Sequence, residues 1–301
     1  MRTEQVTFRS EGVELAGLLR FPDTEEGRYR PIVQGPGWLG LKDGKAYERY
    51  HAALADAGFA TLIFDYRGFG DSGGERGRIS PSDQLTDLIN AVTYITTRDD
   101  LDADNIGALG SGGTGGGNVF LLAHQDARIR AIVSQVPVAD GRDWLHRMRP
   151  EHEWLSFLQA LDDDRRSRVV HGQSRLVDPR EEIMVATPER KQTTVKSDVD
   201  GRVPSKVAIS CADEILRYRP IDAAASIDVP GMVIAVEHDA TTPTDHALQL
   251  FEALRGPKQL VMQRHTSHYA AYETYGDQIA PAIASWFDEH LQRQGLEITR
   301  Y

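Results

Sequence analysis

Apolar residues along the chain follow two patterns, short apolar runs and stripes with helical spacing. Residues 59–64 are almost continuously apolar, which is typical of a strand buried in a parallel sheet. Leu85, Leu88 and Val92 then recur at the spacing of one helix face. Strand and helix patterns alternate in this way over most of the chain. The alternation predicts right-handed βαβ units, and therefore an α/β fold with a mostly parallel, doubly wound sheet.

The alternation stops after Pro137 and returns near residue 220. Residues 140–219 are charged, aromatic and irregular in pattern, and they include the acidic-basic run 162–166. An insertion at this point lies over the carboxyl ends of the strands, where sites form in open α/β sheets. We therefore interpret residues 140–219 as an inserted helical cap, and residues 1–139 and 220–301 as the core.

Composition narrows the class of protein. The 301 residues are 40% hydrophobic and 26% charged, as in a globular protein with a large core, and the net charge of −11 without a basic stripe argues against a nucleic-acid partner. The first ten residues are polar and no apolar run approaches the ~20 residues of a membrane span, so we expect a cytoplasmic protein without membrane association. A homodimer is possible. The single Cys211 excludes an intramolecular disulfide and a Cys-rich zinc site, and we expect no metal.

Three motifs give the chain a family resemblance. They are the loop at 36–40 (Pro-Gly-Trp-Leu-Gly), the strand-end sequence at 65–72 (Asp-Tyr-Arg-Gly-Phe-Gly-Asp-Ser), and the sequence at 268–272 (His-Tyr-Ala-Ala-Tyr). With the order of elements, they resemble the α/β-hydrolase superfamily over nearly the whole chain. The resemblance is strongest to the branch near dienelactone hydrolases and Xaa-Pro-dipeptidyl-peptidase-like esterases. It implies a catalytic order of nucleophile, acid and histidine.

The resemblance assigns the acid and the histidine. His268 follows the last expected strand and occupies the position of the catalytic histidine, with His265 as its nearest rival. Asp239 ends the preceding expected strand and occupies the position of the acid, which orients the imidazole and stabilises its cation. A solvated His268 and a helix-capping Asp239 are the alternatives without catalysis.

The expected nucleophile is missing. The glycine-rich turn at 110–117 lies between an apolar strand and an amphipathic segment, as in the Gly-x-Ser-x-Gly elbow of the superfamily. Counting forward from the strand places the serine position at Gly112, whereas counting back from residues 126–129 places it at Gly113. The apex therefore carries no hydroxyl in either register.

Two neighbouring hydroxyls are candidate substitutes. Residues two positions before and after an elbow nucleophile must be small, a test that Thr114 passes and Ser111 fails because of Leu109. A β-branched threonine, however, is stiff and disfavours the positive φ of an elbow. Three readings therefore stay open: an empty apex, Thr114 as a displaced nucleophile, and Ser111.

The remaining site residues come from the loop, the turn and the insertion. The backbone N–H of Trp38 and that of Gly113 or Gly115 are candidate oxyanion donors. From the insertion, Trp144 and His146 are candidate pocket residues. No phosphate-binding Lys-Ser/Thr follows the glycines, so we expect no cofactor.

These observations predict a cofactor-independent enzyme that acts on a small carbonyl compound. Hydrolysis of an ester, amide or carbon–carbon bond by a His–Asp base is the leading hypothesis, with an atypical or absent nucleophile. A non-hydrolytic lyase, or a binding protein that lost its serine, are the alternatives.

Overall fold

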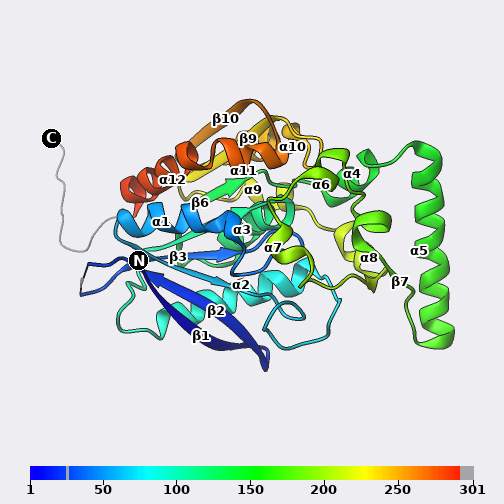
Figure 1. The fold of residues 1–301 in the computed structure, drawn as a ribbon, viewed down its shortest axis with the longest axis horizontal. Helices are drawn as coiled ribbons and strands as arrows, with labels where there is room; N and C mark the ends of the chain where they lie inside the picture. Colours follow the sequence, from blue (N-terminus) through cyan, green and yellow to red (C-terminus); the bar gives the residue numbers. More distant parts are fainter. Residues whose placement is uncertain (25–26, 292–301) are drawn as a thin grey trace.

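A computed structural model describes residues 1–24 and 27–291, and it contains an eight-stranded sheet flanked by helices (Figure 1). The strand order is β1-β2-β4-β3-β5-β6-β9-β10. Pairing is antiparallel for β1 with β2 and for β2 with β4, and parallel across the rest of the sheet. The predicted α/β-hydrolase fold is confirmed. The strands are β1 Arg2–Ser10, β2 Val13–Phe21, β3 Arg30–Gly35, β4 Phe59–Phe64, β5 Ile106–Ser111, β6 Ile129–Gln135, β9 Gly231–His238 and β10 Lys258–Ser267.

Helices cover the two faces of this sheet in separate layers. One apolar cluster packs α1 (Glu48–Asp56) and α12 (Gly276–His290) against one face. The other cluster packs α2 (Pro81–Thr96) and α3 (Gly113–Gln125) against the opposite face, where α9 (Pro220–Ala224) and α10 (Thr244–Ala253) extend the layer. The central strands β3, β4, β5 and β9 are buried on both faces, which explains their mostly apolar sequences.

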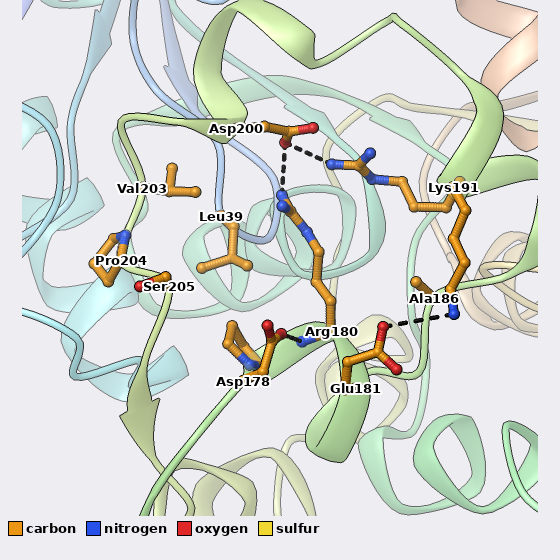
Figure 2. Close-up of a pocket in the computed structure, with 12 residues that line it drawn as sticks. Leu39, Asp178, Arg180, Glu181, Ala186, Lys191, Asp200, Val203, Pro204 and Ser205 are labelled. Carbon is orange, nitrogen blue, oxygen red and sulfur yellow. Dashed lines mark hydrogen bonds and ion pairs between the residues drawn. The ribbon is translucent and has the colours of Figure 1, made fainter.

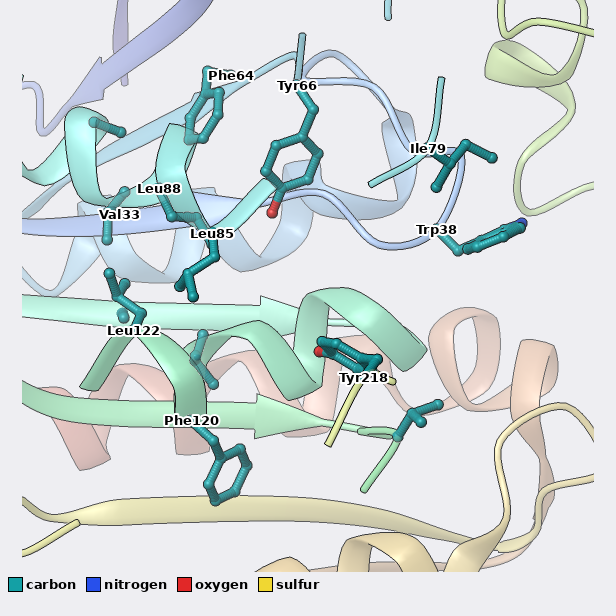
Figure 3. Close-up of a cluster of buried hydrophobic side chains, with 14 of the residues drawn as sticks. Val33, Trp38, Phe64, Tyr66, Ile79, Leu85, Leu88, Phe120, Leu122 and Tyr218 are labelled. Carbon is teal, nitrogen blue, oxygen red and sulfur yellow. The ribbon is translucent and has the colours of Figure 1, made fainter. Parts of the chain in front are cut away.

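Tyr218, whose ring lies in the buried cluster beside α3 (Figure 3), also makes a polar contact that holds the start of α3 in place. The Tyr218 hydroxyl donates to Asn118 Oδ1 (2.9 Å) and to the Thr114 carbonyl (3.0 Å), which belong to the first two turns of α3. Burial raises the pKa of the Tyr218 phenol, so this hydroxyl stays protonated and keeps its role as donor. The contact ties the start of α3 to the chain that returns from the insertion.

Between β6 and β9 the chain is mostly helical, although its sequence pattern is irregular. The acidic-basic run at 162–166 lies inside the 21-residue helix α5, which stands at the edge of the molecule (Figure 1). Ion pairs one turn apart, such as Arg166 with Asp162 at 2.6 Å, run along its exposed side. The elements of this segment are α4 Gly141–Arg147, α5 Glu151–His171, β7 Leu176–Val177, η2 Pro179–Ile183, α6 Pro188–Gln192, α7 Ser197–Asp200, β8 Val207–Ala208 and α8 Cys211–Ile215.

No helix in the two described ranges combines the length and the apolar character needed to cross a membrane. Cys211, the single cysteine, is buried in α8 as a free thiol.

Candidate active site

The glycine-rich turn has Gly112 at its apex. Strand β5 ends at Ser111 and helix α3 begins at Gly113, so Gly112 alone connects them, with a φ of +79°. Glycine adopts this left-handed conformation without a steric penalty. A Cβ atom at Gly112 would find Gly37 Cα at 3.5 Å as its nearest neighbour, which is ordinary contact. The forward count from the strand is therefore the register that the structure adopts.

The other glycines of this turn allow three segments to pack closely. A Cβ at Gly110 would lie 2.1 Å from the Gly115 carbonyl oxygen, so strand and helix approach closely there. A Cβ at Gly115 would lie 3.0 Å from Gly37 Cα, which presses the 36–40 loop against the start of α3. Gly115 thus supports the 36–40 loop. It does not line the small cavity that Gly112 and His268 share.

The hydroxyls of Ser111 and Thr114, on either side of the apex, lie away from the cavity that Gly112 and His268 share. Ser111 Oγ donates to the Tyr272 hydroxyl (3.2 Å) and to Gln135 Oε1 (3.3 Å) beneath the turn. Thr114 is fully buried, and its Oγ1 has no hydrogen-bond partner among the described residues. The structure therefore brings neither hydroxyl to the face that Gly112 presents to the cavity.

His268 and Asp239 lie together at the carboxyl ends of neighbouring strands. His268 is the first residue of α11 (His268–Thr274), directly after β10, and Asp239 directly follows β9. Nδ1 of the imidazole is 2.7 Å from Asp239 Oδ2, and both side chains are buried. Asp239 Oδ1 accepts the backbone N–H groups of Thr241 (2.8 Å) and Thr242 (2.6 Å), which fixes the carboxylate.

The rival histidines point elsewhere. The His265 side chain is 85% exposed and lies near Glu237, and His238 is 67% exposed beside the same carboxylate. His146 is also distant from His268: its Nε2 pairs with Glu151 (2.7 Å) and its ring stacks on Trp154. His146 is therefore not brought to the site, because it belongs to the contact between α4 and α5.

Gly112 and His268 face one small cavity of about 20 Å³, called the inner cavity below. Trp38 and Trp144 form part of its wall, with their rings edge to face at 6.0 Å. Trp144 Nε1 donates to the Thr241 carbonyl (2.8 Å), which ties the insertion to the strand end that carries Asp239. The inner cavity is lined by Trp38, Gly112, Gly113, Trp144, Arg180, Met184, Arg190, Lys196, Thr241, Thr242, His268 and Tyr269.

Three cationic side chains in this wall were not predicted from the sequence. One belongs to each of three short helices or its start: Arg180 lies in η2, Arg190 lies in α6, and Lys196 is the residue before α7. Each of these helices has five residues or fewer. Burial, followed by the nearby Arg180 and Arg190, lowers the pKa of Lys196 to about 8. Elements this short have no periodicity that would place their side chains from sequence. Among the described residues, no group of three or more His, Cys, Asp or Glu side chains could hold a metal ion.

A second contact brings the insertion onto the histidine. Glu189 Oε1 accepts the hydroxyl of Ser267 (2.6 Å) and the backbone N–H groups of Tyr269 (3.0 Å) and Ala270 (3.3 Å). These groups flank His268 at the start of α11, where unpaired N–H groups and the helix dipole favour a carboxylate. Glu189 therefore fixes α6, and with it Arg190, beside the histidine.

Comparison with known proteins agrees with this architecture. An uncharacterized 31.7 kDa protein in the traX-finO intergenic region of Escherichia coli is 32% identical over 94% of this chain and 97% of its own. The acyltransferase drtE of Aspergillus calidoustus is 26% identical, over 85% of this chain and 86% of its own. The crystal structure of the α/β hydrolase GrgF from Penicillium sp. sh18 superposes with a TM-score of 0.79 at 21% identity, covering 97% of this chain and 99% of its own.

The family model of the X-Pro dipeptidyl-peptidase (S15 family) matches residues 11–270, which include every strand of the sheet except β1, the glycine apex and the His268–Asp239 pair. The chain therefore belongs to this family and is a hydrolase-like enzyme with the α/β-hydrolase fold.

Proposed function

We propose that this protein hydrolyses a small carbonyl compound by direct attack of water, with His268 and Asp239 as the general base. One observation carries the proposal: a glycine apex faces the same cavity as a buried, fully formed His–Asp pair. Gly112 has no side chain that a substrate could acylate. Asp239 holds Nδ1 of His268, so Nε2 is the nitrogen left to take a proton on the cavity side.

The inner cavity has room for the attacking water. Its volume of about 20 Å³ exceeds the ~10–15 Å³ that one water molecule needs. In a Gly-x-Ser-x-Gly elbow the serine hydroxyl occupies the space above the apex. Here the Cβ side of Gly112 is open, so a water can take that place. As the water attacks the carbonyl carbon, its proton passes to Nε2, and the imidazolium later returns a proton to the leaving group.

Backbone donors near the apex would stabilise the negative charge that develops on the carbonyl oxygen. Gly113 is the first residue of α3, so its N–H has no acceptor within the helix, and the helix dipole favours an anion there. The N–H of Trp38 is the second donor that we assign. Donors of this kind each contribute about 2.7–4 kcal/mol to transition-state stabilisation. The insertion 140–219 acts as the cap that excludes bulk water from this space, and Trp144 is the residue of α4 that lines the cavity.

The similarity to the acyltransferase drtE supports a substrate with an acyl carbonyl group. The shared fold supports the positions that we assign to the base and to the apex. Esters, thioesters and lactones are therefore the first compounds to test. The enzyme and its His268→Ala variant are assayed with p-nitrophenyl acetate, S-ethyl thioacetate and γ-butyrolactone. We expect turnover by the wild type, loss of turnover in His268→Ala, and normal turnover in His265→Ala, because His265 is exposed.

Two further measurements separate direct attack by water from its rivals. Hydrolysis in H₂¹⁸O should place labelled oxygen in the acid product, and rapid-quench mass spectrometry should show no acyl adduct on the protein. An acyl adduct that forms and decays at the turnover rate would overturn direct attack. Cleavage without ¹⁸O incorporation would indicate a lyase instead, and a wild type no faster than His268→Ala with every compound would indicate a protein that only binds.

A further inference from the structure

We infer that the substrate carries a carboxylate, which Arg180, Arg190 and Lys196 bind next to the reacting carbonyl. The inference rests on the proposed function and adds the chemical class of its substrate. It starts from a second cavity of about 360 Å³, called the outer cavity below and shown in Figure 2. Arg180 and Arg190 line both the outer and the inner cavity, so these two side chains form the boundary between them.

A carboxylate oxygen of the protein already lies between the two guanidinium groups. Asp200 Oδ1 accepts from Arg180 Nη2 at 2.9 Å and from Arg190 Nη2 at 2.5 Å (Figure 2). Planar guanidinium groups bind carboxylates with several parallel donors. The bridge by Asp200 uses one nitrogen of each arginine in these two contacts. Arg180 Nε is buried and has no hydrogen-bond partner among the described residues. This wall therefore has donor capacity that Asp200 does not use.

The positive charge of the wall is not balanced from within the chain. Lys196 Nζ makes no hydrogen bond or ion pair with any residue in the described ranges, although the side chain is mostly buried. Three cations thus face a single bridging carboxylate. Four other acidic groups nearby have partners of their own. Asp239 holds His268, and Asp198 accepts the backbone N–H of Lys45 (2.8 Å). In the wall of the outer cavity, Asp178 accepts the backbone N–H of Arg180 (2.8 Å), and Glu181 lies 3.5 Å from Lys191. An anionic ligand would remove this imbalance.

The position of the cluster defines the substrate further. Gly112, His268 and the three cations line the same cavity, so the carboxylate and the reacting carbonyl must be only a few bonds apart. The rest of the substrate extends into the outer cavity, past the Arg180–Asp200–Arg190 bridge. The expected substrate is a short carboxylic acid with an ester, thioester or ketone group close to its carboxylate. A carboxylate fits the two planar guanidinium groups, whereas inorganic phosphate is the competing anion to test.

The test compares the binding and turnover of charged compounds with those of neutral compounds of similar size. Isothermal titration measures binding of succinate and of succinamide, and steady-state assays compare monomethyl succinate with dimethyl succinate. Lys196→Met removes the unpaired charge, and Lys206→Met is its control because Lys206 is an exposed lysine that lines neither cavity. We expect Lys196→Met to weaken succinate binding about tenfold, to lower kcat/KM for monomethyl succinate and to leave both neutral compounds unchanged. Lys206→Met should stay within about twofold of the wild type for all four compounds.

The pH dependence gives a readout that a structural role of Lys196 would not produce. The titratable groups near Lys196 are Arg180, Arg190, Asp198, Asp200, His268 and Tyr269. Its pKa of about 8 means that succinate affinity should fall as the pH rises through this value. Lys196→Arg should retain the affinity and remove this fall, because an arginine stays protonated.

The binding assay is repeated in His268→Ala, which lacks the base, so that failure of the hydrolytic mechanism is distinguished from failure of the carboxylate site. Succinate binding that depends on Lys196 in this variant supports the carboxylate site whatever the fate of the mechanism. Equal binding of succinate and succinamide, or equal effects of Lys196→Met and Lys206→Met, would overturn it. Inorganic phosphate that binds more tightly than succinate would overturn the assignment to a carboxylate.

Discussion

The imidazole of His268 lies 2.7 Å from the carboxylate of Asp239, although 29 positions separate them in the chain. The two oxygens of Asp239 have separate partners: Oδ2 holds the imidazole and Oδ1 accepts the N–H groups of Thr241 and Thr242. This division lets the orienting role of the carboxylate be removed without disturbing the turn that it stabilises.

Asp239→Asn should abolish most activity with little loss of stability. The amide oxygen of asparagine can keep both backbone contacts, while its NH₂ group would face Nδ1 and impose the tautomer in which Nε2 carries the proton. That tautomer cannot act as a base, and we expect kcat to fall by about 10³–10⁴-fold. Steady-state kinetics and thermal unfolding measure both effects. The control is Asp245→Asn, because Asp245 forms an exposed ion pair with Arg147. This variant should keep the activity of the wild type. A kcat within tenfold of the wild type would argue against the orienting role.

Gly112→Ser should create a nucleophile where the wild type has none. The new Cβ has open space, with its nearest neighbour at 3.5 Å, but a φ of +79° costs a non-glycine residue about 1–3 kcal/mol. Gly112→Ala has the same backbone cost without the hydroxyl and is therefore the matched control. A fluorophosphonate should label Gly112→Ser at this position, and should label neither the wild type nor Gly112→Ala, as read by peptide mass spectrometry. Labelling of the wild type at Ser111 would contradict the apex assigned here.

Thr114→Val should leave activity within about twofold of the wild type. The hydroxyl of Thr114 is buried without a partner, and valine keeps the side-chain shape. Removal of an unsatisfied buried hydroxyl should raise the free energy of unfolding by about 1 kcal/mol, measured by urea denaturation. A fall in kcat of several orders of magnitude would instead identify Thr114 as the nucleophile.

Glu189→Ala should lower kcat through the position of His268. The Glu189 carboxylate accepts three donors around the start of α11, and its removal leaves them unpaired and frees α6 from the histidine. We expect a loss of about tenfold or more in kcat. Glu189→Gln keeps an acceptor oxygen and should restore most of the rate. If both variants lose activity equally, the charge of Glu189 matters more than its position.

Lys196→Met should stabilise the folded protein at neutral pH. The folded-state pKa of Lys196 is about 8, below the ordinary value of 10.5, so the unfolded chain binds more protons between these values. The charged lysine therefore destabilises the fold at pH 7, and this penalty is relieved as the pH rises from about 8 towards 10.5. Because the side chain is partly exposed, the gain should be about 1–2 kcal/mol, less than the full pKa difference implies. Urea denaturation at pH 7 and pH 10 checks the effect, which should be smaller at pH 10.

The sequence by itself determined the sheet, its flanking helices and the positions of His268 and Asp239. Buried parallel strands produce continuous apolar runs, such as residues 231–236 of β9, and Asp239 and His268 each come directly after a strand. Because the carboxyl ends of parallel strands meet at one edge of the sheet, chain order is enough to place the histidine near the acid. The glycine turn was recognisable for the same reason, since it directly follows β5.

Only the tertiary structure decided which glycine is the apex and what surrounds it. The two register counts differed by one residue, and the φ of Gly112 resolves them. The run at 162–166 was helical despite its irregular pattern, because its ion pairs, rather than a continuous apolar stripe, cover the exposed side of α5. Arg180, Arg190 and Lys196 reach the inner cavity from short elements that long-range contacts hold in place, such as that of Glu189 with α11. Local periodicity in the sequence carries no information about such long-range contacts. Tertiary packing therefore decides which charged side chains line the inner cavity.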